Sequence, residues 1–133
     1  MKYRYTLPED VRELCVAHVR GYDRRRRELR EKKKHVYQDG RPEAGAELLD
    51  ELGRSQDKQS VVAVEIAMLQ ALQGIRSKEV RNFLRTGLIL NITNRKQYPY
   101  ERLRLPGVGK KEFYRRKQDL LVALAEALGY IEE

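Results

Sequence analysis

The fold of this 133-residue chain is decided by one stretch near its C-terminus, Pro106–Gly129, which reads PGVGKKEFYRRKQDLLVALAEALG. At 100° per residue, apolar side chains recur along one side of it, which predicts a helix of about twenty residues that begins after Gly109 and stops at Gly129. The wheel places Phe113, Lys117, Leu120, Leu121, Leu124, Ala127 and Leu128 on the inner side, and Lys111, Arg115, Gln118, Val122 and Glu126 on the opposite side.

The opposite side of this helix changes character along its length. Its first half carries cations and a hydrogen-bonding amide, whereas its second half, around Glu126, has lost every cation. A recognition helix has this arrangement because its N-terminal half enters the major groove while its C-terminal half packs against the domain. Lys110 and Lys111 also lie at the positive end of the helix dipole, an unfavourable place for cations that a nearby phosphate would offset. The pattern favours DNA binding over an ordinary solvated surface.

The residues just before this helix complete a helix-turn-helix over residues 98–128. Pro99 is suited to the start of a short first helix, and Pro106 and Gly107 break that helix. The connection that follows has the length of a helix-turn-helix turn. We therefore expect residues 110–128 to be the second, DNA-reading helix.

Four short pieces of the C-terminal sequence stand out: Tyr98-Pro99-Tyr100-Glu101, Leu105-Pro106, Phe113-Tyr114-Arg115-Arg116-Lys117 and Leu128-Gly129-Tyr130-Ile131. In these pieces the chain resembles the C-terminal part of phage late-gene transcriptional activators of the RinA and ArpU type. Those proteins resemble the C-terminal helix-turn-helix domain of bacterial sigma factors, so the resemblance implies a sigma-like DNA-binding domain of phage or prophage origin. The family usually has a polar cap such as Ser before the recognition helix, where this chain has Val108-Gly109.

Two further helices are expected upstream of the helix-turn-helix. The run from about Asp57 to Gln73 is apolar nearly all round, which predicts a buried central helix closed by Gly74. Ser77 can then cap a second helix that ends near Asn91 and Asn94. The apolar residues that recur in this second helix at helical spacing are Val80, Phe83, Leu84, Gly87, Leu88 and Ile92.

The first 38 residues are expected to form one long basic helix that begins near Pro8. Its apolar stripe consists of Val11, Cys15, His18, Tyr22, Leu29 and Val36. A coiled coil needs two apolar positions in every seven residues. After His18 one of these two positions is occupied by Arg25 and then by Lys32, so the apolar stripe is too narrow for a coiled coil. Residues 39–57 are expected to be a linker that can hold a short helix. Because no alternating strand pattern occurs, the fold class is all-α: a long N-terminal helix and a helical bundle over residues 58–133 that ends in the sigma-like helix-turn-helix.

Positive charge is concentrated in two segments. The net charge is +8, yet residues 20–38 carry +6 and residues 80–118 carry +9, with acidic segments between and after them. Patterned positive charge points first to a phosphate backbone as partner, through release of counterions. For the N-terminal run Arg24–Arg27 alone, a solvated helix face explains the charge equally well.

Several function classes are disfavoured by what the sequence lacks. The longest apolar run, Val61–Val64, stops at Glu65, and no apolar signal region follows Lys2, so we expect no membrane partner and a location in the bacterial host cytoplasm. The single cysteine and two histidines offer no disulfide and little for a metal site, and we expect no cofactor. No clustered carboxylates, phosphate loop or nucleophile motif is present, so we expect no enzyme.

The sequence is best interpreted as a sequence-specific regulator of transcription that binds duplex DNA. Base-edge contacts are expected from Lys111, Arg115 and Gln118, and phosphate contacts from Lys110, Tyr114, Arg116, Arg24, Arg25, Arg26 and Arg27. Contact with RNA polymerase and a homo-oligomer are left open. One alternative is a phage packaging or assembly protein that oligomerises and binds nucleic acid non-specifically, and another is an adaptor for an acidic protein.

Overall fold

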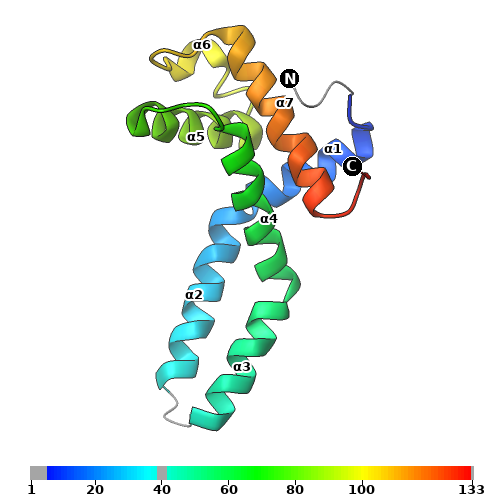
Figure 1. The fold of residues 1–133 in the computed structure, drawn as a ribbon, viewed down its shortest axis with the longest axis vertical. Coiled ribbons are helices and arrows are strands. Elements are labelled where there is room, and N and C mark those ends of the chain that lie inside the picture. The colour runs from blue at the N-terminus through cyan, green and yellow to red at the C-terminus, as the bar shows by residue number, and fades with distance from the viewer. Residues whose placement is uncertain (1–5, 39–41, 133) are drawn as a thin grey trace.

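The computed structural model describes residues 6–38 and 42–132, and every regular element in these ranges is a helix, which confirms the all-α fold class. The helices are α1 (Glu9–Arg20), α2 (Tyr22–Gln38), α3 (Pro42–Arg54), α4 (Gln56–Ala71), α5 (Lys78–Thr93), α6 (Tyr100–Leu103) and α7 (Lys110–Ala127). In Figure 1, α2 and α3 form a projecting antiparallel arm, while α1, α5, α6 and α7 gather around the far end of α4. We call this group of helices, together with the end of α4 that they surround, the head. The candidate DNA-reading helix α7 therefore belongs to the head and not to the arm.

The single helix expected at the N-terminus is divided into α1 and α2, which run in different directions from Gly21 (Figure 1). The backbone at Gly21 remains close to helical, with φ −85° and ψ −3°. A Cβ at this position would lie 2.4 Å from the Arg25 guanidinium, which folds back and donates to the backbone oxygen of His18 at 3.3 Å. Gly21 is thus the residue that leaves room for Arg25 to satisfy the end of α1.

The arm contains more helix than the sequence predicts, because α3 occupies 13 residues of the segment expected to be a linker. The connection at residues 39–41 lies outside the described residues. Between the two helices of the arm runs a groove of about 450 Å³, lined by Lys32, His35, Val36, Leu48, Glu51 and Leu52. Leu48 remains 42% exposed, so the arm buries little apolar surface compared with the head.

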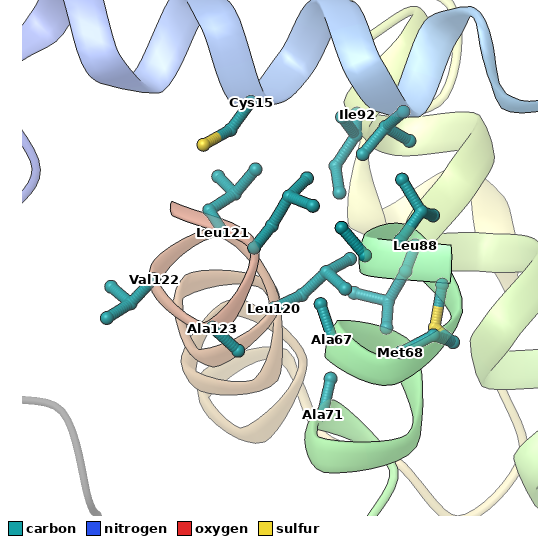
Figure 2. Close-up of a cluster of buried hydrophobic side chains, with 14 of the residues drawn as sticks. Cys15, Ala67, Met68, Ala71, Leu88, Ile92, Leu120, Leu121, Val122 and Ala123 are labelled. Atoms are coloured by element: carbon teal, nitrogen blue, oxygen red, sulfur yellow. The ribbon is translucent and has the colours of Figure 1, made fainter. Parts of the chain in front are cut away.

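The core of the head is formed where α7 crosses α4, with α1 and α5 packed alongside. Figure 2 shows Leu120 and Ala123 of α7 facing Ala67 and Ala71 of α4, with Cys15 of α1 next to Leu121. The alanines are almost completely buried. Their small side chains let the two helices approach closely and interdigitate with the leucines.

Two serines fix where the central helices begin. The Ser55 hydroxyl accepts a hydrogen bond from the Lys58 backbone N–H at 3.2 Å, and the Ser77 hydroxyl accepts one from Val80 at 3.2 Å. Each satisfies a backbone donor that the first turn of a helix leaves without a partner. The cap predicted at Ser77 is confirmed, whereas the cap at Ser55 was not predicted.

Helix α5 departs from its predicted apolar face at one residue. Phe83 is 47% exposed, although its spacing predicts burial, while Leu84 and Leu88 are fully buried. Gly87 lies where the chain after α6 crosses α5, and a Cβ there would lie 3.1 Å from Leu105 Cδ2. The glycine therefore permits the close approach of the two segments.

Leu124 provides a test of this core. Its side chain is 0% exposed, so Leu124→Ala should lower the free energy of unfolding by about 2–5 kcal/mol through lost burial and an unfilled cavity. Urea denaturation followed by circular dichroism measures the change. Leu69→Ala is the matched control, because Leu69 is 72% exposed and should lose little. Equal losses in the two variants would show that the face of α7 is misassigned.

Candidate nucleic-acid interface

The connection before α7 is a tight turn held by a tyrosine. Helix α6 begins after Pro99 as predicted but has only four residues, and the chain reverses through left-handed backbone at Arg104 (φ 49°) and Gly107 (φ 72°). The Tyr100 hydroxyl donates a hydrogen bond to the backbone oxygen of Val108 at 2.5 Å. This bond joins α6 to the residue that precedes the Gly109 cap of α7.

The same tyrosine packs against the first turn of α7. The rings of Tyr100 and Phe113 have centroids 5.6 Å apart, and Phe113 and Val108 are buried. These contacts fix the start of α7 even though Gly109 supplies no side-chain cap. The sequence alone does not reveal this role of Tyr100, because nothing local connects a ring to a backbone oxygen eight residues later.

The first half of α7 presents the predicted base-reading residues on one side of the helix. Lys111 and Arg115 are exposed and Gln118 is half-buried. Asp119 lies beside them, and burial raises the pKa of its carboxyl, against the opposing effect of Arg115. This side of α7 therefore combines two cations, an amide and a partly desolvated carboxyl group.

Most of the second half of α7 is buried on every side, although Ala127 at its end, which is expected on the inner side, is exposed. All six residues from Leu120 to Ala125 are buried, including Val122, which is 0% exposed. The prediction that Val122 lies on the outer side was wrong. A wheel with one buried face cannot represent a helix that packs against α4 and α1 at once.

Two of the predicted phosphate contacts flank the start of α7. The Lys110 Nζ lies 2.6 Å from a carboxylate oxygen of Glu101, and both side chains are 60% exposed. The hydrogen bond between them raises the pKa of Lys110 and lowers that of Glu101. Tyr114 packs edge-on against Phe113, with ring centroids 5.3 Å apart, and is half-buried.

Arg116, which was also predicted to contact phosphate, is engaged with the protein. Its Nη1 donates to the backbone oxygens of Ala71 and Gln73 at 2.9 and 3.0 Å, and its Nε donates to Glu112 at 3.0 Å. The side chain is only 11% exposed. A cation at the negative end of α4 is favourable, so Arg116 holds α7 against α4.

The four consecutive arginines at the start of α2, Arg24–Arg27, also divide into those bound to the protein and those exposed to solvent. Arg25 lies 3.7 Å from Asp57 and is 19% exposed, whereas Arg24 pairs with Glu28 at 3.4 Å on the surface. The Arg26 guanidinium lies 6.0 Å from the ring of Tyr22 and, like Arg27, is exposed. Arg24, Arg26 and Arg27 are thus available to a ligand, while Arg25 links α2 to α4.

Lys117 is the one buried cation of α7, as its place on the inner side of the wheel predicts. It is 6% exposed, and burial, reinforced by the charges of Arg12 and Arg95, lowers the pKa of its ammonium to about 8. The nearest described aromatic ring is that of Tyr114, whose centroid lies 5.9 Å from Nζ. Among the described residues no carboxylate lies within ion-pair distance of it.

His18 and Cys15, the residue types that most often bind metals, are both engaged in the packing of the head. The ring nitrogens of His18 lie 2.5 Å from the Ser60 hydroxyl and 3.0 Å from the Tyr130 hydroxyl, which ties α1 to α4 and to the chain after α7. Cys15 is buried, and desolvation raises the pKa of its thiol to about 11. Within residues 6–38 and 42–132, no three His, Cys, Asp or Glu side chains are grouped so as to hold a metal ion.

None of the helices described is long and apolar enough to cross a membrane.

Comparison with known proteins adds no assignment: no family model, curated protein or solved structure matches the chain.

The buried ammonium predicts a dependence of stability on pH. The pKa of Lys117 is about 8 in the folded chain and 10.5 when exposed, so the unfolded chain binds more protons between these values and the free energy of unfolding rises with pH. Lys117→Met removes this rise and should stabilise the protein at pH 7 by about 2–3 kcal/mol. Urea denaturation of both proteins at pH 7, 8, 9 and 10 gives the difference between their free energies of unfolding as a function of pH.

An exposed lysine provides the control for this experiment. Lys96→Met should give a curve parallel to that of the parent chain, because Lys96 is exposed. If the Lys117→Met curve is parallel as well, the ammonium of Lys117 is solvated and not desolvated.

Proposed function

We propose that the chain is a sequence-specific DNA-binding regulator of transcription whose α7 enters the major groove with its first half. One observation carries the proposal: Lys111 and Arg115 are exposed on the same helix whose next segment, Leu120–Ala125, is completely buried. A helix anchored by one half and exposed by the other can hold base-reading side chains in fixed positions. A merely solvated helix does not require this division.

The side chains on the exposed half have the chemistry that base reading needs. Arginine and lysine donate to the O6 and N7 of guanine, and a glutamine amide pairs with the N6 and N7 of adenine. We assign base contacts to Lys111, Arg115 and Gln118, and phosphate contacts to Lys110 and Tyr114. Arg116 and Arg25 are left out of the contact set, because their guanidinium groups bond to the protein itself.

The arm supplies a second, sequence-independent contribution. Arg24, Arg26 and Arg27 lie on the exposed side of α2 and offer charge without a fixed reading geometry. Such a surface adds affinity for any duplex and makes binding depend on salt. The resemblance to phage late-gene activators supports a role in the cytoplasm of a bacterial host, with RNA polymerase as a further partner.

A phage packaging or assembly protein is the second candidate, and the arm favours it. The groove between α2 and α3 leaves apolar surface at Leu48 exposed, as an oligomer contact would. Selection of bound sequences from random duplex DNA separates the two functions. Recovery of one sequence motif supports the regulator, and recovery of unrelated sequences supports the assembly protein.

Arg115 should govern specificity. Arg115→Ala should remove about 1–3 kcal/mol of discrimination at one base position, because a bidentate contact to guanine would be lost. The measurement is a titration of the selected duplex and of duplexes changed at single positions. Arg81→Ala, an exposed arginine of α5, is the matched control and should retain full discrimination. A loss of affinity that is equal for selected and scrambled duplexes would contradict the base-reading role.

The exposed arginines Arg24, Arg26 and Arg27 of α2 should contribute to affinity for DNA but, unlike Arg115, not to specificity. Replacing Arg24, Arg26 and Arg27 by glutamine should weaken all duplexes alike and reduce the slope of log affinity against log salt by about one unit per lost phosphate contact. Titrations at several salt concentrations measure the slope. A change in sequence preference in this variant would place the reading surface on the arm and not on α7.

Glu101 should limit the affinity for DNA. Its carboxylate holds Lys110 at 2.6 Å and places a negative charge beside the start of α7. Glu101→Gln should raise the affinity for every duplex by a few-fold and steepen the salt dependence, because Lys110 can then turn to a phosphate. Glu79→Gln on the exposed start of α5 is the control for a simple change in net charge. Equal effects of the two substitutions would remove Lys110 from the interface.

A further inference from the structure

The arm has an apolar groove but no core of its own. Its two helices, α2 and α3, lie side by side and project from the head (Figure 1), and the groove of about 450 Å³ runs between them. The apolar side chains that line it are Val36, Leu48 and Leu52, and Leu48 is 42% exposed. Among the described side chains of α2 and α3 only Tyr22, at the start of α2, is buried. Because two helices alone do not enclose their apolar sides, the groove calls for a partner that covers it.

The two walls of this groove carry opposite charge. Lys32 and His35 line it from α2, and Glu51 lines it from α3. The same division extends along the helices, because α2 has eight Lys and Arg against three Asp and Glu, whereas α3 has one Arg against four Asp and Glu. The arm therefore presents a basic helix and an acidic helix side by side.

These charges are not neutralised between the two helices. Two ion pairs lie within α2 and a third joins it to α4, but none joins α2 to α3 among the described residues. Lys32 and Glu51 are both exposed, and neither makes an ion pair with a described residue. Each wall of the groove can therefore pair with side chains of opposite charge on another molecule.

A second copy of this chain is the partner whose charge fits both walls. Duplex DNA is repelled by the acidic wall at Glu51, and an acidic protein is repelled in the same way. A second arm brings a basic helix for the acidic wall and an acidic helix for the basic wall, together with its own Leu48 and Val36 for the apolar floor. Self-complementarity of this kind is what a two-fold contact requires.

We propose that two copies of the chain associate through their arms, with α2 of each copy against α3 of the other in a four-helix bundle. A two-fold axis along the arm gives this pairing, whereas an axis across the arm would place α2 against α2 and α3 against α3, where like charges repel. With the axis along the arm, the heads of both copies lie at the same end of the bundle. If the head binds DNA, a consequence that rests on the proposed function, the two copies of α7 read half-sites related by the same axis.

Self-association is tested first on the full chain without DNA. Sedimentation equilibrium over a range of concentrations should show only monomer and dimer, with a dissociation constant that rises with salt. Leu48→Asp should raise that constant about ten-fold or more, because a charge would lie on the apolar floor of the interface. Leu69→Asp is the matched control, since Leu69 is 72% exposed on α4, outside the arm, and its replacement should leave the constant as it is. Circular dichroism checks that both variants keep their helix content.

Two charge reversals test which helices meet. Lys32→Glu and Glu51→Lys change exposed side chains, and each should weaken self-association because both α2–α3 contacts of its dimer then bring like charges together. Mixing the two variants should restore association, since every such contact of the mixed dimer again joins a cation to a carboxylate. Glu79→Lys, at the exposed start of α5, is the matched control for charge and should not restore association when mixed with Lys32→Glu.

The outcomes are independent of DNA binding. Restored association in the mixed dimer supports the inference even for a chain that binds no duplex. A parent chain that stays monomeric at every concentration would overturn it and leave the DNA-binding proposal intact. Species that grow beyond the dimer with concentration would replace the closed pair by an open assembly. Tighter association of Lys32→Glu with the parent chain than with Glu51→Lys would place α2 against α2 and contradict the pairing.

Discussion

Six consecutive residues of α7, Leu120–Ala125, are buried, so this half of the helix has no side that faces solvent. Enclosing it requires partners on several sides, and α4 and α1 supply them. Ala67 and Ala71 make the close approach of α4 possible, and Arg116 adds hydrogen bonds from α7 to the backbone oxygens at the end of α4. Because the buried half is fixed in this way, the direction of the exposed half is fixed as well.

The proposed DNA-reading role of the exposed half depends on that fixed direction. Side chains such as Lys111 and Arg115 can read bases only if the helix that carries them is held to within a fraction of a helical turn, which flexible segments do not achieve. The turn before α7 contributes from the other end, through the Tyr100 hydrogen bond to Val108 and the ring contact with Phe113. The charged arm, by contrast, buries little apolar surface, and the proposed function therefore gives it only a sequence-independent attraction for DNA.

Local patterns predicted much of this architecture, and long-range contacts account for what they missed. The Ser77 cap and the burial of Phe113, Leu120 and Leu124 follow from capping chemistry and helical spacing. The division at Gly21 does not, since the glycine keeps nearly helical dihedral angles and its nearest neighbour is the guanidinium of Arg25, four residues further along the chain. Arg116 is expected from the sequence to contact phosphate, yet its partners are backbone oxygens more than forty residues away. Charge alone cannot separate a ligand-binding arginine from one that ties two helices together.

We propose that α7 is anchored by one half and reads DNA with the other. The selected duplex is added to the ¹⁵N-labelled chain, and amide shifts are recorded together with hydrogen exchange. Shifts should be largest over residues 110–118, while the amides of residues 120–125 remain the most protected in the chain and keep that protection in the complex. Shifts confined to α2, or exchange of the amides of residues 120–125 as fast as those of the arm, would contradict this proposal.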